Sequence, residues 1–149
     1  MSKRLENTDA LKFIFAGNST VTLMNNKTEN RFTYRVKKAK DSNLFFVSVL
    51  SGGEYSYLGT VSNGIYRHGK KSNFAAGSQS EKVFSYVLDK LKENSLPECI
   101  EIWHEGRCGK CGRPLTVPSS IITGIGPDCV KKLSKEDKRD LFLTSILGL

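Results

Sequence analysis

The chain lacks any apolar run long enough to cross a bilayer. Its longest run, Leu44–Leu50, is far shorter than the roughly 20 residues that a transmembrane helix needs. The polar N-terminus MSKRLENTDA has no apolar signal core behind it. A phosphate-binding glycine loop, a dinucleotide-binding glycine pattern and a paired nucleophile and base are also missing. We therefore expect a non-enzymatic protein that stays in the compartment where it is made.

Cysteine is missing from the first two thirds of the chain. All four cysteines lie in the last third, at Cys99, Cys108, Cys111 and Cys129. A secreted disulfide scaffold would spread its cysteines over a smaller fold, whereas a clustered Cys-x2-Cys favours a metal site in a reducing compartment. A redox Cys-x2-Cys is the rival interpretation, but nothing here resembles the strand-then-helix setting of such a pair.

Acidic residues are too few to balance the basic ones. Against 23 Lys and Arg there are 15 Asp and Glu, which gives 149 residues a formal net charge of +8. A positive field of this size favours nucleic acid or an acidic protein surface as partner, and charge alone does not separate the two.

Short β-branched and alternating segments, joined by turn residues, predict an antiparallel meander of four or five strands. Their expected positions are Ser19–Met24, Arg31–Lys37, Leu44–Leu50, Tyr55–Val61 and Ile65–Arg67. Apolar residues on both faces of Leu44–Leu50 predict a central strand. Asn7–Gly17 fits either a short helix or the entry to the first strand.

Helical periodicity is clearest between residues 78 and 94. Ser78-x-x-Glu81 has the spacing of a capping box, and apolar residues then recur at helical intervals. A second helical stretch opens at Ser134. The predicted fold class is α+β, with residues 1–98 forming an antiparallel β-meander packed by one helix. Residues 99–149 then form a small treble-clef-like zinc finger and a C-terminal helix.

The cysteine motif predicts a Cys3His zinc site. The spacing His104-x3-Cys108-x2-Cys111-x17-Cys129 combines a zinc knuckle with a sulfur near a helix start, where Pro127 fits the first helical position. Cys99 is the alternative to His104 as fourth ligand. Because four protein ligands close the coordination sphere, we expect structural Zn²⁺ that performs no reaction.

The segment WHEGRCGKCGRPLTVPSSIITGIGPDCVKK resembles the cysteine motif of an uncharacterised family of phage and prophage proteins. The family pattern reads H-x3-C-x2-C-G-[RK]-x-L-T-x-P-x-S-x4-G-[IF]-G-P-x-C, and residues 15–38 and 45–59 are similar to the region that precedes it. The acidic residue usual around Pro118 is absent here. The resemblance implies a phage-encoded zinc protein in the cytoplasm of a bacterial host, without implying an activity.

Three basic groups are candidates for nucleic-acid binding: Arg31, Arg35, Lys37, Lys38 and Lys40; Arg67, Lys70 and Lys71; Arg107, Lys110 and Arg113. Five aromatic residues could stack on unpaired bases, namely Phe32, Tyr34, Tyr55, Tyr57 and Tyr66. Alternation, however, places Phe32 and Tyr34 on the face opposite Arg31 and Arg35. The plain interpretation is therefore an amphipathic strand with its aromatics in the core and its charges in water.

Two functions of different classes remain open. The first is a nucleic-acid-binding accessory protein (DNA or RNA) in phage replication, recombination or transcription. The second is a protein–protein module that binds and diverts or inhibits a host protein, including a defence nuclease. The first is the preferred prediction by a thin margin, and neither prediction specifies an oligomeric state.

Overall fold

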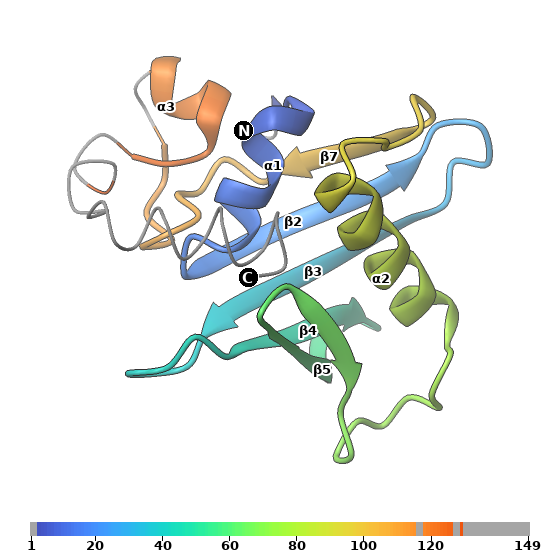
Figure 1. Cartoon of the computed structure of the whole chain (residues 1–149). Coiled ribbons are helices and arrows are strands. Elements are labelled where there is room, and N and C mark those ends of the chain that lie inside the picture. The colour runs from blue at the N-terminus through green and yellow to red at the C-terminus, as the bar shows by residue number, and fades with distance from the viewer. Residues whose placement is uncertain (1–2, 116–117, 127–128, 130–149) are drawn as a thin grey trace.

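The computed structural model describes residues 3–115, 118–126 and 129. These residues form a seven-stranded antiparallel sheet with a few helices, which agrees with the predicted α+β class (Figure 1). The helix predicted after Ser134 lies outside the described residues.

The sheet has the strand order β1-β7-β2-β3-β4-β5-β6. Strands β2 to β6 form the predicted meander, and β7 and then β1 add to the free edge of β2. The bounds are β1 Lys3–Arg4, β2 Asn18–Asn25, β3 Arg31–Lys38, β4 Phe45–Ser51, β5 Glu54–Ser62, β6 Ile65–His68 and β7 Ile100–His104. The predicted boundary between residues 98 and 99 therefore falls just before a strand of the same sheet.

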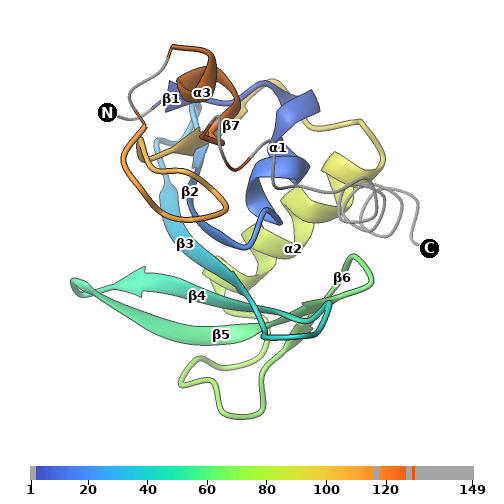
Figure 2. The same ribbon diagram turned by 90° about the vertical axis from the view of Figure 1, so that its left-hand side faces the viewer.

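Two helices cover one face of this sheet. Helix α1 (Asn7–Ile14) and helix α2 (Gln79–Lys92) lie on the same side of β2 and β3 (Figure 2). Their apolar residues, together with the inward residues of the strands, form one hydrophobic core. A short helix, α3 (Pro118–Thr123), was not predicted. No helix within the described ranges is long and apolar enough to span a membrane.

The opposite face of the sheet carries no described helix. On β3, Tyr34 and Val36 are fully buried under the helices while Arg31 and Lys37 are exposed, as the alternation predicts. Strand β4 lies between β3 and β5, as predicted for a central strand. Its face away from the helices is nevertheless open, because Phe46 is 42% exposed and Leu50 is 40% exposed. The apolar residues of β4 therefore supply one core face and one surface face, because the helices cover only one side.

Glu81 ties α2 to strand β6. Its Oε1 accepts the Gly77 N–H at 2.7 Å, and its Oε2 accepts bonds from the Tyr66 hydroxyl at 2.5 Å and from His68 Nδ1 at 2.6 Å. Burial acts to raise the pKa of this carboxyl, but the three donors outweigh it and leave the pKa lowered. The predicted capping glutamate thus accepts a backbone N–H just before the helix, while Ser78 occupies the N-cap position without a side-chain capping bond to the helix backbone.

We predict that Glu81→Gln lowers the free energy of unfolding at neutral pH by about 1–3 kcal/mol, because a buried acceptor of three bonds is weakened. Since the folded-state pKa lies below the unfolded one, this stabilisation is present above the unfolded pKa and is lost as pH falls through the folded pKa. Urea titrations at several pH values measure it, with exposed Glu93→Gln as control. Parallel stability–pH curves for wild type and Glu81→Gln would contradict the assignment.

Candidate metal centre and open sheet face

Three of the four predicted metal ligands come together. The Sγ atoms of Cys108, Cys111 and Cys129 all lie within 4.8 Å of one another. Cys108 and Cys129 are buried and Cys111 is exposed. This group could hold a metal ion, and three sulfur donors fit a thiolate-binding metal such as zinc.

The first two cysteines lie at the tip of a small hairpin. An isolated bridge joins Arg107 to Pro114, and the Cys108 N–H donates to the Arg113 carbonyl at 2.8 Å. The chain then folds tightly, because the Gly112 N–H donates to the Cys108 carbonyl at 2.8 Å with Gly112 at a φ of +79°. The Cys-x2-Cys turn therefore has the compact form that its spacing predicts.

Backbone N–H groups surround the sulfur of Cys108. Lys110 donates to Sγ at 3.4 Å and Gly126 donates at 3.3 Å. Burial acts to raise the pKa of Cys108, but these donors outweigh it and lower the pKa. Burial also raises the pKa of Cys129 to about 12, together with hydrogen bonds to Cys111 and Cys108. The site thus favours a thiolate at Cys108, and a bound cation would replace the proton on Cys129.

Phe13 of α1 attaches the hairpin to the rest of the fold. Its ring is fully buried against two glycines: a Cβ at Gly109 would lie 2.8 Å from Cδ1 of the ring, and one at Gly124 would lie 2.3 Å from it. Backbone hydrogen bonds also join the hairpin to its neighbours. The Asn18 N–H at the start of β2 donates to the Gly109 carbonyl at 2.7 Å, and the Gly109 N–H donates to the Gly124 carbonyl at 2.8 Å. The cysteine hairpin is therefore held at the α1–β2 corner.

His104, the predicted fourth ligand, lies outside the group of sulfurs. Its Nδ1 accepts the Gly106 N–H at 2.9 Å, and its Nε2 lies 2.5 Å from the Ile121 carbonyl, to which it donates. The imidazole is fully buried, and this burial is the main cause that lowers its pKa. Because His104 ends β7 on the helix-covered face, its ring contacts α3 and Phe13. In the structure it positions backbone and does not join the sulfurs.

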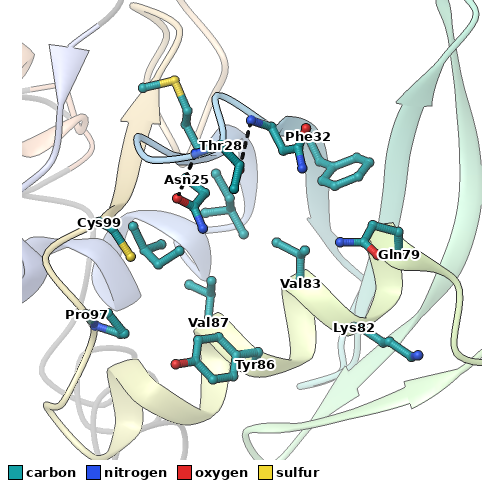
Figure 3. A pocket seen from close by; sticks show the side chains of 14 residues that line it. Asn25, Thr28, Phe32, Gln79, Lys82, Val83, Tyr86, Val87, Pro97 and Cys99 are labelled. Atoms are coloured by element: carbon teal, nitrogen blue, oxygen red, sulfur yellow. Dashed lines mark hydrogen bonds between the residues drawn. The ribbon is translucent and has the colours of Figure 1, made fainter.

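Cys99, the alternative ligand, is placed elsewhere. It lies before β7, at the other end of that strand from His104, and lines a pocket of about 500 Å³ beside α2. Figure 3 shows its thiol near Pro97, with Tyr86 and Val87 of α2 on the neighbouring wall. Within the described part of the chain, Cys99 belongs to no cluster of potential ligands.

A second feature, a groove of about 860 Å³, crosses the open face of the sheet. Trp103, Glu105 and Arg107 line one side, and Leu50 and Tyr55 line the other, with β2 and β3 between them. Figure 2 shows the elements that carry the lining residues, with β7 above, the β4–β5 hairpin below, and β2 and β3 between them. Of the predicted basic residues, Arg31, Arg35 and Arg107 line it.

The three groove arginines are not paired with acidic residues of the described ranges. None of them forms an ion pair with a carboxylate among the described residues. Arg35 instead lies over the ring of Tyr55, with its guanidinium carbon 4.0 Å from the ring centroid. Arg107 Nη1 donates to the Gly112 carbonyl at 3.2 Å, which links the groove to the cysteine hairpin.

The other predicted basic residues do not line the groove. Register places Lys37 and Arg67 on the open face, opposite Phe46 and Thr60 of the neighbouring strands. Lys38 has the other parity, at the end of β3. The loop residues are Lys40 between β3 and β4, Lys70 and Lys71 after β6, and Lys110 and Arg113 around the cysteines.

Of the aromatic residues on the basic strand, Phe32 lines the groove and Tyr34 does not. Phe32 and Tyr34 pack toward the core, as the alternation requires. Tyr55 and Trp103 reach the arginine face from β5 and β7. Trp103 went unrecognised because strand pairing across the sheet, and not spacing along the chain, brings it beside β2.

We predict that Cys111→Ala abolishes metal binding and destabilises the hairpin, since a structural zinc ion contributes roughly 10–16 kcal/mol of apparent binding energy in small modules. Metal analysis of the purified protein should find one zinc ion per wild-type chain and none in the variant. Cys99→Ala is the matched control and should retain the ion. Equal metal content in wild type and Cys111→Ala would refute the centre.

For His104→Ala we predict retained metal and lower stability, because the Gly106 N–H and the Ile121 carbonyl lose their partner. X-ray absorption at the zinc edge measures this, since sulfur neighbours lie at about 2.3 Å and imidazole nitrogen at about 2.0–2.1 Å. We expect three sulfurs and no imidazole. An imidazole shell that disappears in the variant would return His104 to the ligand set.

Comparison with known proteins found one family model that matches part of the chain, and that family has no assigned activity. The model of DUF6011, a family of unknown function, matches residues 103–134, which include all three clustered cysteines. Searches of curated proteins and of solved structures found no match.

Proposed function

We propose that this chain is a nucleic-acid-binding accessory protein and that the groove on the open sheet face is its binding surface. The observation that carries the proposal is the set of three arginines, Arg31, Arg35 and Arg107, in one groove with Trp103 and Tyr55. Guanidinium groups contact phosphate oxygens bidentately, and aromatic rings stack on bases. Both ingredients occur here on one face.

The balance of charge in the groove supports a polyanion. Three guanidiniums face a single carboxylate, that of Glu105, in a chain whose net charge is +8. Because the arginines have no ion-pair partner in the described ranges, a phosphate would displace counterions and no protein carboxylate. Lys37 and Arg67, farther along the same face, would extend the positive path.

The metal centre acts in this proposal as a structural support. Zn²⁺ bound by Cys108, Cys111 and Cys129 holds the hairpin that presents Arg107 to the groove. In this proposal the ion supplies a cross-link between the segments that carry the three cysteines. The treble-clef form and the origin in a phage, which the cysteine motif suggests, belong to the same proposal.

A second candidate function, binding to a host protein, is supported by the apolar residues on the same face. Phe46 and Leu50 are exposed there at 42% and 40%. Protein interfaces bury such residues at their centre. The arginines and the groove nevertheless favour nucleic acid, and binding assays separate the two candidates.

We predict that Arg35→Glu weakens binding to a labelled oligonucleotide at least about tenfold. The substitution removes one phosphate contact and places a negative charge in the groove, which repels the phosphates. Fluorescence anisotropy measures the dissociation constant. Lys90→Glu makes the same charge change on α2, which covers the other face, and is the matched control. The control should bind within about twofold of wild type.

Two outcomes would contradict the proposal. Equal losses in both variants would mean that net charge, and not the groove, governs binding. Undetectable binding of wild type to any oligonucleotide, together with a nuclease-resistant complex between the chain and a host protein, would favour the second candidate.

A further inference from the structure

The groove contains two separate surfaces on which a flat ring can stack. One is the indole of Trp103, half-buried and oriented by a hydrogen bond from its Nε1 to Glu101 Oε1 at 3.0 Å. The other is the pair formed by Arg35 and Tyr55, in which the guanidinium lies 4.0 Å from the ring centroid. Arginine planes and aromatic rings both stack on bases.

Strand order sets the separation of these two surfaces. Trp103 lies on β7 and Tyr55 on β5, with β2, β3 and β4 between them. At about 4.8 Å per strand, Trp103 is roughly 10 Å along the sheet from Arg35 on β3 and roughly 19 Å from Tyr55, more than the thickness of one base. They would therefore stack on two different bases of one strand. Bases inside a duplex are already covered by their neighbours, so these surfaces suit unpaired bases.

A hydroxyl–carboxylate chain lies between the two stacking surfaces. Thr22 donates to Glu105 Oε1 at 2.7 Å, and Thr33 lies 2.7 Å from the Thr22 hydroxyl. Since the Thr22 proton points to Glu105, Thr33 must be the donor to Thr22. Glu105 is exposed and has no ion-pair partner among the described residues, although three arginines line the same groove.

Glu105 is the one carboxylate among the residues that line this groove, and its negative charge weakens the attraction for phosphate. Its position is explained if it binds a different part of the ligand, one that donates hydrogen bonds. An ionised carboxylate only accepts hydrogen bonds. Among the bases, guanine presents two adjacent donors on its pairing edge, N1–H and the 2-amino group. Those donors match the two oxygens of one carboxylate, whereas the pairing edge of thymine or uracil has a single donor between two acceptors.

We propose that the groove is a single-strand site in which Trp103 and the Arg35–Tyr55 pair stack on unpaired bases and Glu105 accepts hydrogen bonds from the edge of a guanine. This inference rests on the proposed function and narrows its ligand to single-stranded, guanine-containing nucleic acid. DNA and RNA share these bases and phosphates, so both are tested.

The experiment measures binding of the zinc-loaded full chain to three probes by fluorescence anisotropy. The probes are an oligothymidine decamer, the same decamer with guanines at its two central positions, and a ten-base-pair duplex hairpin; uridine versions distinguish RNA from DNA. We expect both single strands to bind more tightly than the duplex. We also expect the guanine decamer to bind at least about fivefold more tightly than oligothymidine, as one bidentate base contact provides.

The variants separate stacking from phosphate contacts. Trp103→Ala should weaken single-strand binding about tenfold, the loss expected for one stacked base, and leave duplex binding unchanged. Trp103→Phe keeps an aromatic surface and should recover most of the affinity. Glu105→Gln keeps an acceptor for Thr22 but turns one oxygen into a donor, so the guanine preference should disappear while oligothymidine binding is retained or strengthened.

Each contrary result has a distinct meaning. Duplex binding as tight as single-strand binding, with Trp103→Ala without effect, would overturn the single-strand site while leaving the proposed function in place. Equal affinity of wild type for the two decamers would overturn the role of Glu105. Absence of binding to all probes would instead overturn the proposed function itself.

Discussion

The structure depends on one constraint: helices cover only one face of a seven-stranded sheet within the described residues. Alternate residues of each strand therefore face either the buried core or the open side of the sheet. On β3 this places Tyr34 and Val36 in the core on the helix-covered side and leaves Arg31 and Arg35 on the other side. The hydrophobic effect that builds the core thus also collects the cationic side chains on one surface, with no attraction among them required.

Strand β7 joins the metal centre to this surface. Its alternate residues serve both sides of the sheet: Ile102 and His104 are buried on the helix side, while Trp103 lines the groove. His104 holds the backbone of Gly106 and Ile121, the segments on either side of the cysteine hairpin. Metal at the three cysteines would in this way influence the groove through Arg107, which lies three residues after the end of β7 and directly before Cys108.

Much of the fold could be predicted from local sequence. The alternation in Arg31–Lys37 correctly assigned side chains to faces, and the helical period after Ser78 correctly located α2. For residues 7–17 the pattern left helix and strand open, and the structure has a helix, because Ala10, Leu11, Phe13 and Ile14 can then all enter the core. The open second face of β4 was missed, since apolar residues on a strand do not reveal whether a second layer covers them.

Only part of the candidate site could be predicted from the sequence, because several of its contacts join residues that are far apart along the chain. Cys108 and Cys111 are close in sequence, and the glycines beside them made the turn predictable. The separation of His104 from the sulfurs depends on hydrogen bonds with Gly106 and Ile121, which spacing alone does not encode. The groove depends on register across several strands, as in the pairing of Thr22 with both Thr33 and Trp103. Long-range pairing of this kind leaves no local signal.

The most direct test of the central claim is the salt dependence of oligonucleotide binding by the wild-type protein. Three guanidiniums that contact phosphates of a single strand, at roughly 0.7 counterions released per contact, predict a slope of about −2 or steeper when log affinity is plotted against log salt concentration. A slope near zero, or no measurable binding at low salt, would show that the arginine face does not bind nucleic acid.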